Sequence, residues 1–269
     1  IPEWFIPWYE LIVDEWNCLG EGGFGSVNRA TWLDSEVVVK RVTLPGSKAI
    51  AMFRREVDIW FGFSHPHVIR LFGACHVGRP FFVCEYATNG TLVSYLRSHT
   101  DELWSKLHEA ALGVQYLHAR DVVHGDLKGN NIVIGSDLKA KVTDFGLSSA
   151  VSSEDTAQIS GAWLWVAPEC FPDDKAGQQA RPSFASDIYS LGMCIVEALR
   201  LVEAVQAGKD SRSCLPWRVT DRIVVIHNAK QGNLPARPLC SDSQWKLVER
   251  MCKLNPKERI KISTVVDEL

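Results

Sequence analysis

The sequence lacks several features that place a chain in a class at once. No apolar run reaches the ~20 residues of a membrane-spanning helix, the longest being the short run around Leu191 to Leu199. The net charge is −3 without a long run of one sign, which argues against a nucleic-acid-binding face. The eight histidines show no H-E-x-x-H or other metal-binding spacing, and the eight cysteines form no Cys-x-x-Cys pair. These absences disfavour a membrane-spanning protein, a nucleic-acid binder and a zinc site.

The cysteines are far apart, and we interpret them as reduced core thiols of a cytoplasmic protein rather than a disulfide framework. The chain opens on Ile1 and shows no signal-peptide pattern. We therefore expect a piece of a longer multidomain protein, or the cytosolic part of a membrane-anchored one. Its 269 residues suffice for one large domain or two small ones that share an interface. The oligomeric state stays open.

The first 85 or so residues predict a small, mostly β unit with one helix. Val37–Val39 is β-branched and bounded by polar or turn residues, as in a strand, and further strands are expected over 68–72 and 81–84. Ser47 is a plausible N-cap for a helix. That helix would have one apolar face, formed by Phe53, Val57, Trp60 and Phe61.

The remainder predicts a mainly helical unit. A helix starts near residues 100–102 and continues with apolar residues at helical spacing: Leu103, Leu107, Ala111, Val114 and Leu117. The run from Ser190 to Leu199 is apolar nearly all round and predicts a buried helix. Short strands are expected over 122–123, 132–134 and 140–142, and residues 172–182 read as an exposed loop.

A G-x-G-x-x-G-x-V motif runs from Gly20 to Val27, with glycines at 20, 22, 23 and 25. Alone it is ambiguous, because similar glycines open a dinucleotide-binding fold, and a plain flexible hairpin is a further possibility. A dinucleotide fold requires a helix directly after the glycines, whereas residues 26–31 resemble a strand. A glycine-rich hairpin lets backbone N–H groups approach phosphates without side-chain obstruction.

A lysine follows on the next predicted strand. Lys40 ends the run Val37–Val39, and a lysine there is usually a solvated surface charge. Glu56, on the following helix, is predicted to face the sheet. An ion pair between them would fix the ammonium group, which could then meet the same phosphates.

The segment from His124 to Asn131 and the triplet Asp144-Phe145-Gly146 place two aspartates and an asparagine in short polar loops. Such residues can be ordinary turn residues. However, apolar strands flank each loop and would bring the loops together at one end of a small sheet. Asn131 and Asp144 offer oxygen ligands that suit magnesium, which leaves Asp126 to orient an attacking hydroxyl.

Together with Ala167-Pro168-Glu169, Asp187 and Arg259, these motifs resemble, in this order, the signatures of eukaryotic protein kinases. The resemblance spans nearly the whole chain, from Leu19 to Arg259. It implies an α+β, bilobal fold: an N-lobe with a small antiparallel sheet and one helix over about 1–86, a hinge over about 85–90, and a larger, mainly helical C-lobe over about 91–269. It also implies ATP and Mg²⁺ as cofactors and proteins as substrates.

The resemblance assigns roles to the motif residues. Gly20, Gly22 and Gly25 would cover the ATP phosphates, and Lys40 would contact the α- and β-phosphates while paired with Glu56. Asp126 would position the substrate hydroxyl, Lys128 would neutralise charge on the transferring phosphoryl group, and Asn131 and Asp144 would hold magnesium. Further nucleotide contacts are expected from Val27, Val38, Cys84 as gatekeeper, Glu85 and Ala87 of the hinge, and Val133.

Three more residues would support the larger lobe. Glu169 and Arg259 resemble its buried ion pair, and Asp187 resembles the anchor beneath the catalytic loop. Lys128, two residues after Asp126, is typical of serine/threonine kinases. The residues 163–166 before Ala167 and residues 30–32 resemble the tyrosine-kinase-like branch, which is mostly Ser/Thr-specific, so we expect a signalling kinase of that kind.

Three residues depart from the family pattern. Gly125 replaces the arginine of His-Arg-Asp, which normally receives a phosphate from the activation loop. The loop hydroxyls Ser148, Ser149, Ser152, Ser153, Thr156 and Ser160 therefore lack that partner, and we hypothesise that activity depends little on their phosphorylation. Val38 replaces a smaller alanine and would narrow the adenine pocket.

Ala162 stands where a threonine usually bonds the catalytic Asp and Lys. Such a hydrogen bond contributes about 0.5–1.5 kcal/mol, so its loss would slow the chemistry roughly tenfold. Gly125 and Ala162 thus leave a second interpretation open: a kinase-shaped module that binds nucleotide and partners with little or no phosphoryl transfer.

Overall fold

The structure is a computed structural model that describes residues 1–22, 25–42, 46–145, 162–171, 181–210 and 214–269. The described residues fall into two compact units, one over residues 1–88 and the other over residues 89–145 with the described part of 162–269. No helix in these described ranges is long and apolar enough to cross a membrane.

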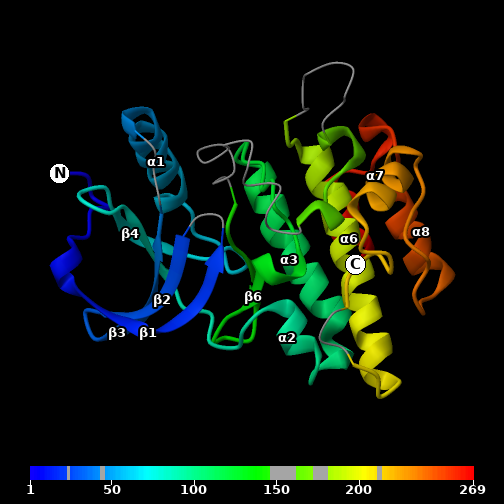
Figure 1. Cartoon of the computed structure of the whole chain (residues 1–269), viewed down its shortest axis with the longest axis horizontal. Helices are drawn as coiled ribbons and strands as arrows, with labels where there is room; N and C mark the ends of the chain where they lie inside the picture. Colours follow the sequence, from blue (N-terminus) through cyan, green and yellow to red (C-terminus); the bar gives the residue numbers. More distant parts are fainter. Residues whose placement is uncertain (23–24, 43–45, 146–161, 172–180, 211–213) are drawn as a thin grey trace. The chain divides into compact units, whose positions relative to one another are not determined.

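The first unit is an antiparallel sheet with one helix, α1 (Gly46–Phe61) (Figure 1). The sheet follows the order β1-β2-β3-β5-β4, and every neighbouring pair is antiparallel. Its strands are β1 (Leu11–Gly22), β2 (Gly25–Trp32), β3 (Ser35–Arg41), β4 (Leu71–Cys75) and β5 (Phe81–Glu85). The short 3₁₀ helix η1 (Trp8–Glu10) precedes β1. The predicted sheet with a single helix is confirmed.

Both faces of this sheet carry buried side chains. Successive residues of a strand point to opposite faces. Val37, Val38 and Val39 are all buried. On one face, the ring of Phe82 lies 4.7 Å from that of Phe53 and 5.5 Å from that of Trp60, both on α1. The predicted apolar face of the helix is therefore the packing face.

Two boundaries differ from the prediction. The helix α1 begins at Gly46, so Ser47 is its second residue and not its N-cap. The strand β4 begins at Leu71, three residues later than the apolar run suggests, although Val68 and Ile69 are buried. The carbonyl of Ile69 accepts a hydrogen bond from the Trp60 indole at 2.9 Å, so this residue is tied to α1 ahead of the strand.

The second unit is mainly helical, as predicted, and its longest helix is α6 (Phe184–Gln206), which packs against α3 (Leu103–His118). The other helices are α2 (Leu92–Leu96), α7 (Arg222–Lys230), α8 (Asp242–Met251) and α9 (Ile262–Glu268). Short 3₁₀ turns are η2 (Thr100–Glu102), η3 (Gly129–Asn131), η4 (Ala162–Leu164), η5 (Pro168–Cys170) and η6 (Pro256–Glu258). A two-stranded hairpin joins β6 (Ile132–Ile134) and β7 (Ala140–Val142).

The burial of α3 and α6 follows the sequence pattern. The five predicted apolar residues of α3 and all residues from Leu191 to Leu201 are buried. Ser183 caps α6, since its side chain accepts from the Ser186 N–H in a reciprocal capping box. The strand expected over 122–123 is not formed, and most of the loop expected over 172–182 lies outside the described residues.

Candidate active site

The glycine motif forms the hairpin between β1 and β2. Gly20 pairs with Val27 and Gly22 pairs with Gly25, while residues 23 and 24 lie outside the described part. Gly25 has a φ of +127°, and a Cβ there would collide with the Arg41 carbonyl oxygen. Only glycine fits this position. The strand that follows excludes the dinucleotide-binding alternative.

Four predicted nucleotide contacts share one face of the sheet. Val27 lies opposite Lys40, and Val38 lies opposite Cys84. Since Val38 and Lys40 are two residues apart, and directly opposed residues of antiparallel strands point the same way, all four side chains face one side. Phe82 lies opposite Lys40, so this is also the face that α1 covers.

The remaining predicted residues of this unit lie at the end of β5 and on α1. Glu85 ends β5, and Ala87 follows it; both are half-buried. Glu56 on α1 and Lys40 on β3 are also half-buried. The ion pair between Lys40 and Glu56 stays a prediction.

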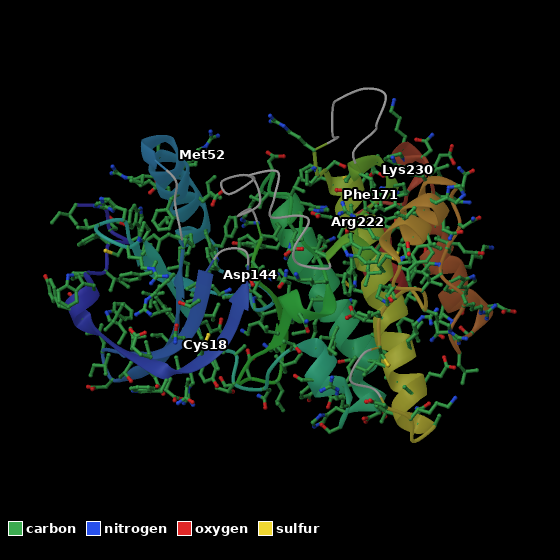
Figure 2. The ribbon with its side chains drawn as sticks, viewed as in Figure 1. Cys18, Met52, Asp144, Phe171, Arg222 and Lys230 are labelled. Carbon is green, nitrogen blue, oxygen red and sulfur yellow. The ribbon has the colours of Figure 1, made fainter. Side chains whose placement is uncertain are left out.

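The catalytic-loop residues contact one another. The Asn131 Nδ2 donates to the Asp126 carboxylate at 2.9 Å and to the Asp126 carbonyl at 2.7 Å. The Lys128 Nζ lies 3.5 Å from the same carboxylate. Asp144, labelled in Figure 2, follows β7. Its φ is +60°, a conformation that costs energy for a non-glycine residue and is common at functional sites. Val133, half-buried, lies on β6 opposite Lys141.

Burial shifts the pKa of two residues of the loop. Burial raises the pKa of Asp126, while Lys128 and His124 oppose the rise. Burial lowers the pKa of His124 and favours a neutral ring. Its Nε2 lies 2.8 Å from the Thr143 carbonyl, and its Nδ1 accepts the Asp126 N–H at 3.2 Å. These partners assign the proton to Nε2.

Asp187 on α6 fixes the backbone at the start of the loop. Its carboxylate accepts the His124 N–H at 2.8 Å and the Gly125 N–H at 2.9 Å, and it also contacts the His118 Nε2 at 2.9 Å. Only 1% of Asp187 is exposed. Gly125 adopts a φ of +80°, the left-handed region that favours glycine.

Glu197 is a site residue that the sequence analysis missed. Its Oε2 accepts the Gly129 N–H at 2.9 Å and the Trp165 Nε1–H at 3.0 Å. Burial raises its pKa to about 7, although these two donors and Lys128 oppose the rise. The available signal was a single acid in the otherwise apolar run from Leu191 to Leu199, because a lone acid inside a buried helix needs partners.

Glu169 and Arg259 form the expected ion pair. The guanidinium donates to both carboxylate oxygens at 2.7 and 2.8 Å, and the Arg259 side chain is fully buried. Two parallel bonds of this kind fix geometry as well as adding stability. Ala162 lies in η4, whereas the loop hydroxyls at 148, 149, 152, 153, 156 and 160 are outside the described residues.

Comparison with known proteins matches residues 13–269 to the family model of the protein tyrosine and serine/threonine kinase. A probable serine/threonine-protein kinase of Dictyostelium discoideum, drkD, is 28% identical over 96% of the chain and 19% of its own length. The mouse tyrosine-protein kinase Srms is 29% identical over 94% of the chain and 52% of its own length.

A putative leucine-rich repeat receptor-like serine/threonine-protein kinase of Arabidopsis thaliana is 29% identical over 93% of the chain and 30% of its own length. The chain thus spans between about a fifth and a half of the length of these three relatives.

Proposed function

Because the chain belongs to the protein tyrosine and serine/threonine kinase family, we propose that it transfers the γ-phosphoryl group of ATP to serine and threonine hydroxyls of proteins. The observation that carries the proposal is the cluster of Asp126, Lys128 and Asn131 on a loop anchored by Asp187. This cluster supplies a carboxylate for the hydroxyl and a cation for the phosphoryl charge.

Asp126 is the group that orients the hydroxyl and accepts its proton. Burial raises its pKa, and a base works best when its pKa lies nearer the operating pH. The bond from the Asn131 amide leaves the second carboxylate oxygen of Asp126 for the substrate. Lys128, next to the same carboxylate, balances the negative charge of the transferring group.

The first unit binds the nucleotide in this proposal. Backbone N–H groups of Gly20, Gly22 and Gly25 meet the phosphates, and Lys40, oriented by Glu56, contacts the α- and β-phosphates. The adenine contacts proposed in this unit are Val27, Val38, Cys84, Glu85 and Ala87, and the family resemblance adds Val133 of the second unit. The buried Val38 and Cys84 side chains offer the apolar surface that a base requires.

Asn131 and Asp144 fit a magnesium ion. The Asn131 nitrogen bonds Asp126, so its amide oxygen remains for a cation, and Asp144 adds a carboxylate. Among the described residues no three His, Cys, Asp or Glu side chains form a metal cluster. Magnesium is bound by one or two carboxylates together with phosphates and water. When bound, the ion would neutralise phosphate charge.

Serine/threonine specificity is supported by Lys128, the residue typical of such kinases at that position, and by residues 163–166 of the tyrosine-kinase-like type. The relatives carry both kinds of name. We further propose that the chain is the cytoplasmic catalytic part of a longer signalling protein.

A second candidate is a kinase-fold scaffold that binds nucleotide and partner proteins with little transfer. Gly125 and Ala162 favour it, because each removes a side chain that most active kinases use. The catalytic polar residues are all present, and we therefore prefer the enzyme.

Incorporation of labelled phosphate into a generic protein substrate with Mg-ATP decides between the two. We expect phosphoserine and phosphothreonine, and a loss of at least about a hundredfold, near 3 kcal/mol, in Asp126→Asn and Lys40→Met. Phosphotyrosine as the main product would contradict the specificity. No incorporation by a folded protein that Mg-ATP stabilises against heat would favour the scaffold.

A further inference from the structure

Residues 3–6, which we call the Trp4 segment, are built into the sheet of the first unit. The Ala74 N–H donates to the Trp4 carbonyl at 2.8 Å, and the Ile6 N–H donates to the Ala74 carbonyl at 3.0 Å. Phe5 thereby forms a parallel bridge with Ala74 of β4. Because β4 is an edge strand of the sheet, the segment covers that edge.

Two side chains of the segment, Trp4 and Ile6, are as buried as the core, whereas Phe5 is half-buried and Glu3 is exposed. Trp4 is 3% exposed and Ile6 is 4% exposed. The rings of Trp4 and Phe5 each meet the His76 ring edge-on at 5.6 Å. A Cβ at Gly73 of β4 would collide with the Trp4 carbonyl and the Ile6 side chain, so β4 has a glycine where the segment approaches most closely.

The segment reaches both sides of the sheet. Ile6 packs in a cluster with Val37, Val39 and Val83, which is the face opposite Phe82 and α1. Trp4 instead reaches the helix, since its Nε1–H donates to the Asp58 carboxylate at 2.5 Å. Figure 2 marks α1 by Met52. The segment therefore ties the helix to the strand edge and to the far face of the sheet.

We propose that Trp4 is a positioning residue, which tethers α1 through Asp58 and so fixes the Glu56 carboxylate for phosphoryl transfer. Glu56 and Asp58 lie on the same turn of α1, whose inner face already packs through Phe53 and Trp60. The tether acts on the flank of the helix and limits its rotation and sliding on the sheet. This inference rests on the proposed function for its effect on rate, but its structural part does not.

A pair of substitutions at Asp58 separates the tether from general stability. Asp58 is exposed, so neither change disturbs the core. Asp58→Asn keeps an oxygen that accepts the Trp4 indole N–H, whereas Asp58→Ala removes it. Alanine also has the higher helix propensity, so a looser α1 in Asp58→Ala would reflect the lost tether. Arg55→Ala, at an exposed position of the same helix, is the control.

We expect Asp58→Ala to lower kcat about fivefold to tenfold, as the loss of one ordinary hydrogen bond would, with the KM for the protein substrate unchanged. Asp58→Asn and Arg55→Ala should stay within about twofold of the wild type. Trp4→Phe, which keeps the ring but loses the N–H, should match Asp58→Ala, and the double variant should be no slower than either single one.

Hydrogen exchange of the α1 amides gives a readout that needs no activity. Exchange should be faster in Asp58→Ala and Trp4→Phe, and unchanged in Asp58→Asn. Unchanged exchange in Asp58→Ala would overturn the tether, and faster exchange with an unchanged or raised kcat would overturn the positioning role. A wild-type protein without transferase activity would refute the proposed function, while the exchange data would still decide whether the tether exists.

Discussion

Gly125, in the catalytic loop, adopts a backbone conformation that would cost free energy for most other residues. Its φ of +80° lies in the region where an L side chain costs roughly 1–2 kcal/mol. In this conformation the Gly125 N–H and the His124 N–H both donate to the Asp187 carboxylate. Glycine adopts it freely, so the loop is ordered by Asp187 without help from a side chain at position 125.

Substitutions at Gly125 test this argument. We expect Gly125→Ala to destabilise the protein by about 1–2 kcal/mol and to lower kcat about tenfold. Gly125→Asn should be milder on both counts, since asparagine tolerates left-handed backbone. Thermal unfolding and steady-state kinetics check the order of the two variants. If alanine and asparagine behave alike, side-chain volume rather than backbone conformation governs this position.

The sequence predicted the site residues that stand in recognisable motifs, including Asp187 and the pair Glu169 and Arg259, whose partners are distant in the chain. Asp126, Lys128 and Asn131 lie within one motif, so the motif implies their contacts. The roles of Asp58 and Glu197 were not predicted. The donor to Asp58 is Trp4, 54 residues away, and the donors to Glu197 are Gly129 and Trp165, 68 and 32 residues away. Neither partner forms part of a periodic pattern, and only the folded chain brings them together.

At the scale of elements, α6 connects several segments of the larger unit, because two buried carboxylates on this helix accept hydrogen bonds from them. The Asp187 carboxylate accepts the backbone N–H groups of residues 124 and 125. The Glu197 carboxylate accepts the backbone N–H of Gly129 in η3 and the indole N–H of Trp165. A Cβ at position 129 would press on the Glu197 carboxylate and on the Val93 side chain. Glycine at this position therefore allows the helix to approach the catalytic loop.

The buried carboxylate of Glu197 predicts a pH-dependent stability. Its folded pKa of about 7 lies above its usual value of 4.5, so its contribution is greatest below pH 4.5 and is lost as the pH rises to 7. Glu197→Gln resembles the protonated acid. We expect the variant to equal the wild type near pH 4.5 and to gain up to about 3 kcal/mol relative to it above pH 7.

Denaturant unfolding of both proteins between pH 4.5 and 8 measures this difference. Glu203→Gln, a change of an acid that is half-exposed on the same helix, controls for general charge effects. A constant difference between Glu197→Gln and the wild type at all pH values would show that Glu197 stays ionised in the folded protein.

Among the elements, periodic segments were the most predictable. The apolar residues of α3 and α6 and the run Val37–Val39 are buried as expected. The apolar run at 68–72 predicted a strand that begins too early. Its first residues are buried in a loop, which is held to α1 by the hydrogen bond from the Trp60 indole to the Ile69 carbonyl. Residues 122 and 123 have the β-branched side chains of a strand but no ladder in the described fold. Apolar character indicates burial, while a strand also needs a partner.

At the scale of the whole molecule, the question is which signal controls the enzyme. In many kinases a loop phosphate binds the arginine of His-Arg-Asp and thereby orders the site. Here position 125 is glycine, and the loop start is fixed internally by Asp187. The tether of α1 by the Trp4 segment is likewise internal. Both features favour an active arrangement that does not require loop phosphorylation.

Replacement of the six loop hydroxyls (148, 149, 152, 153, 156 and 160) by alanine tests this independence. We expect kcat/KM to stay within about threefold of the wild type, under 1 kcal/mol. Phosphatase-treated wild-type protein should show the same rate, because position 125 has no arginine that could bind the loop phosphate. Loss of more than about tenfold in rate with unchanged thermal unfolding would mean that a loop phosphate acts through another cation, and the internal anchoring by Asp187 would then be insufficient for activity.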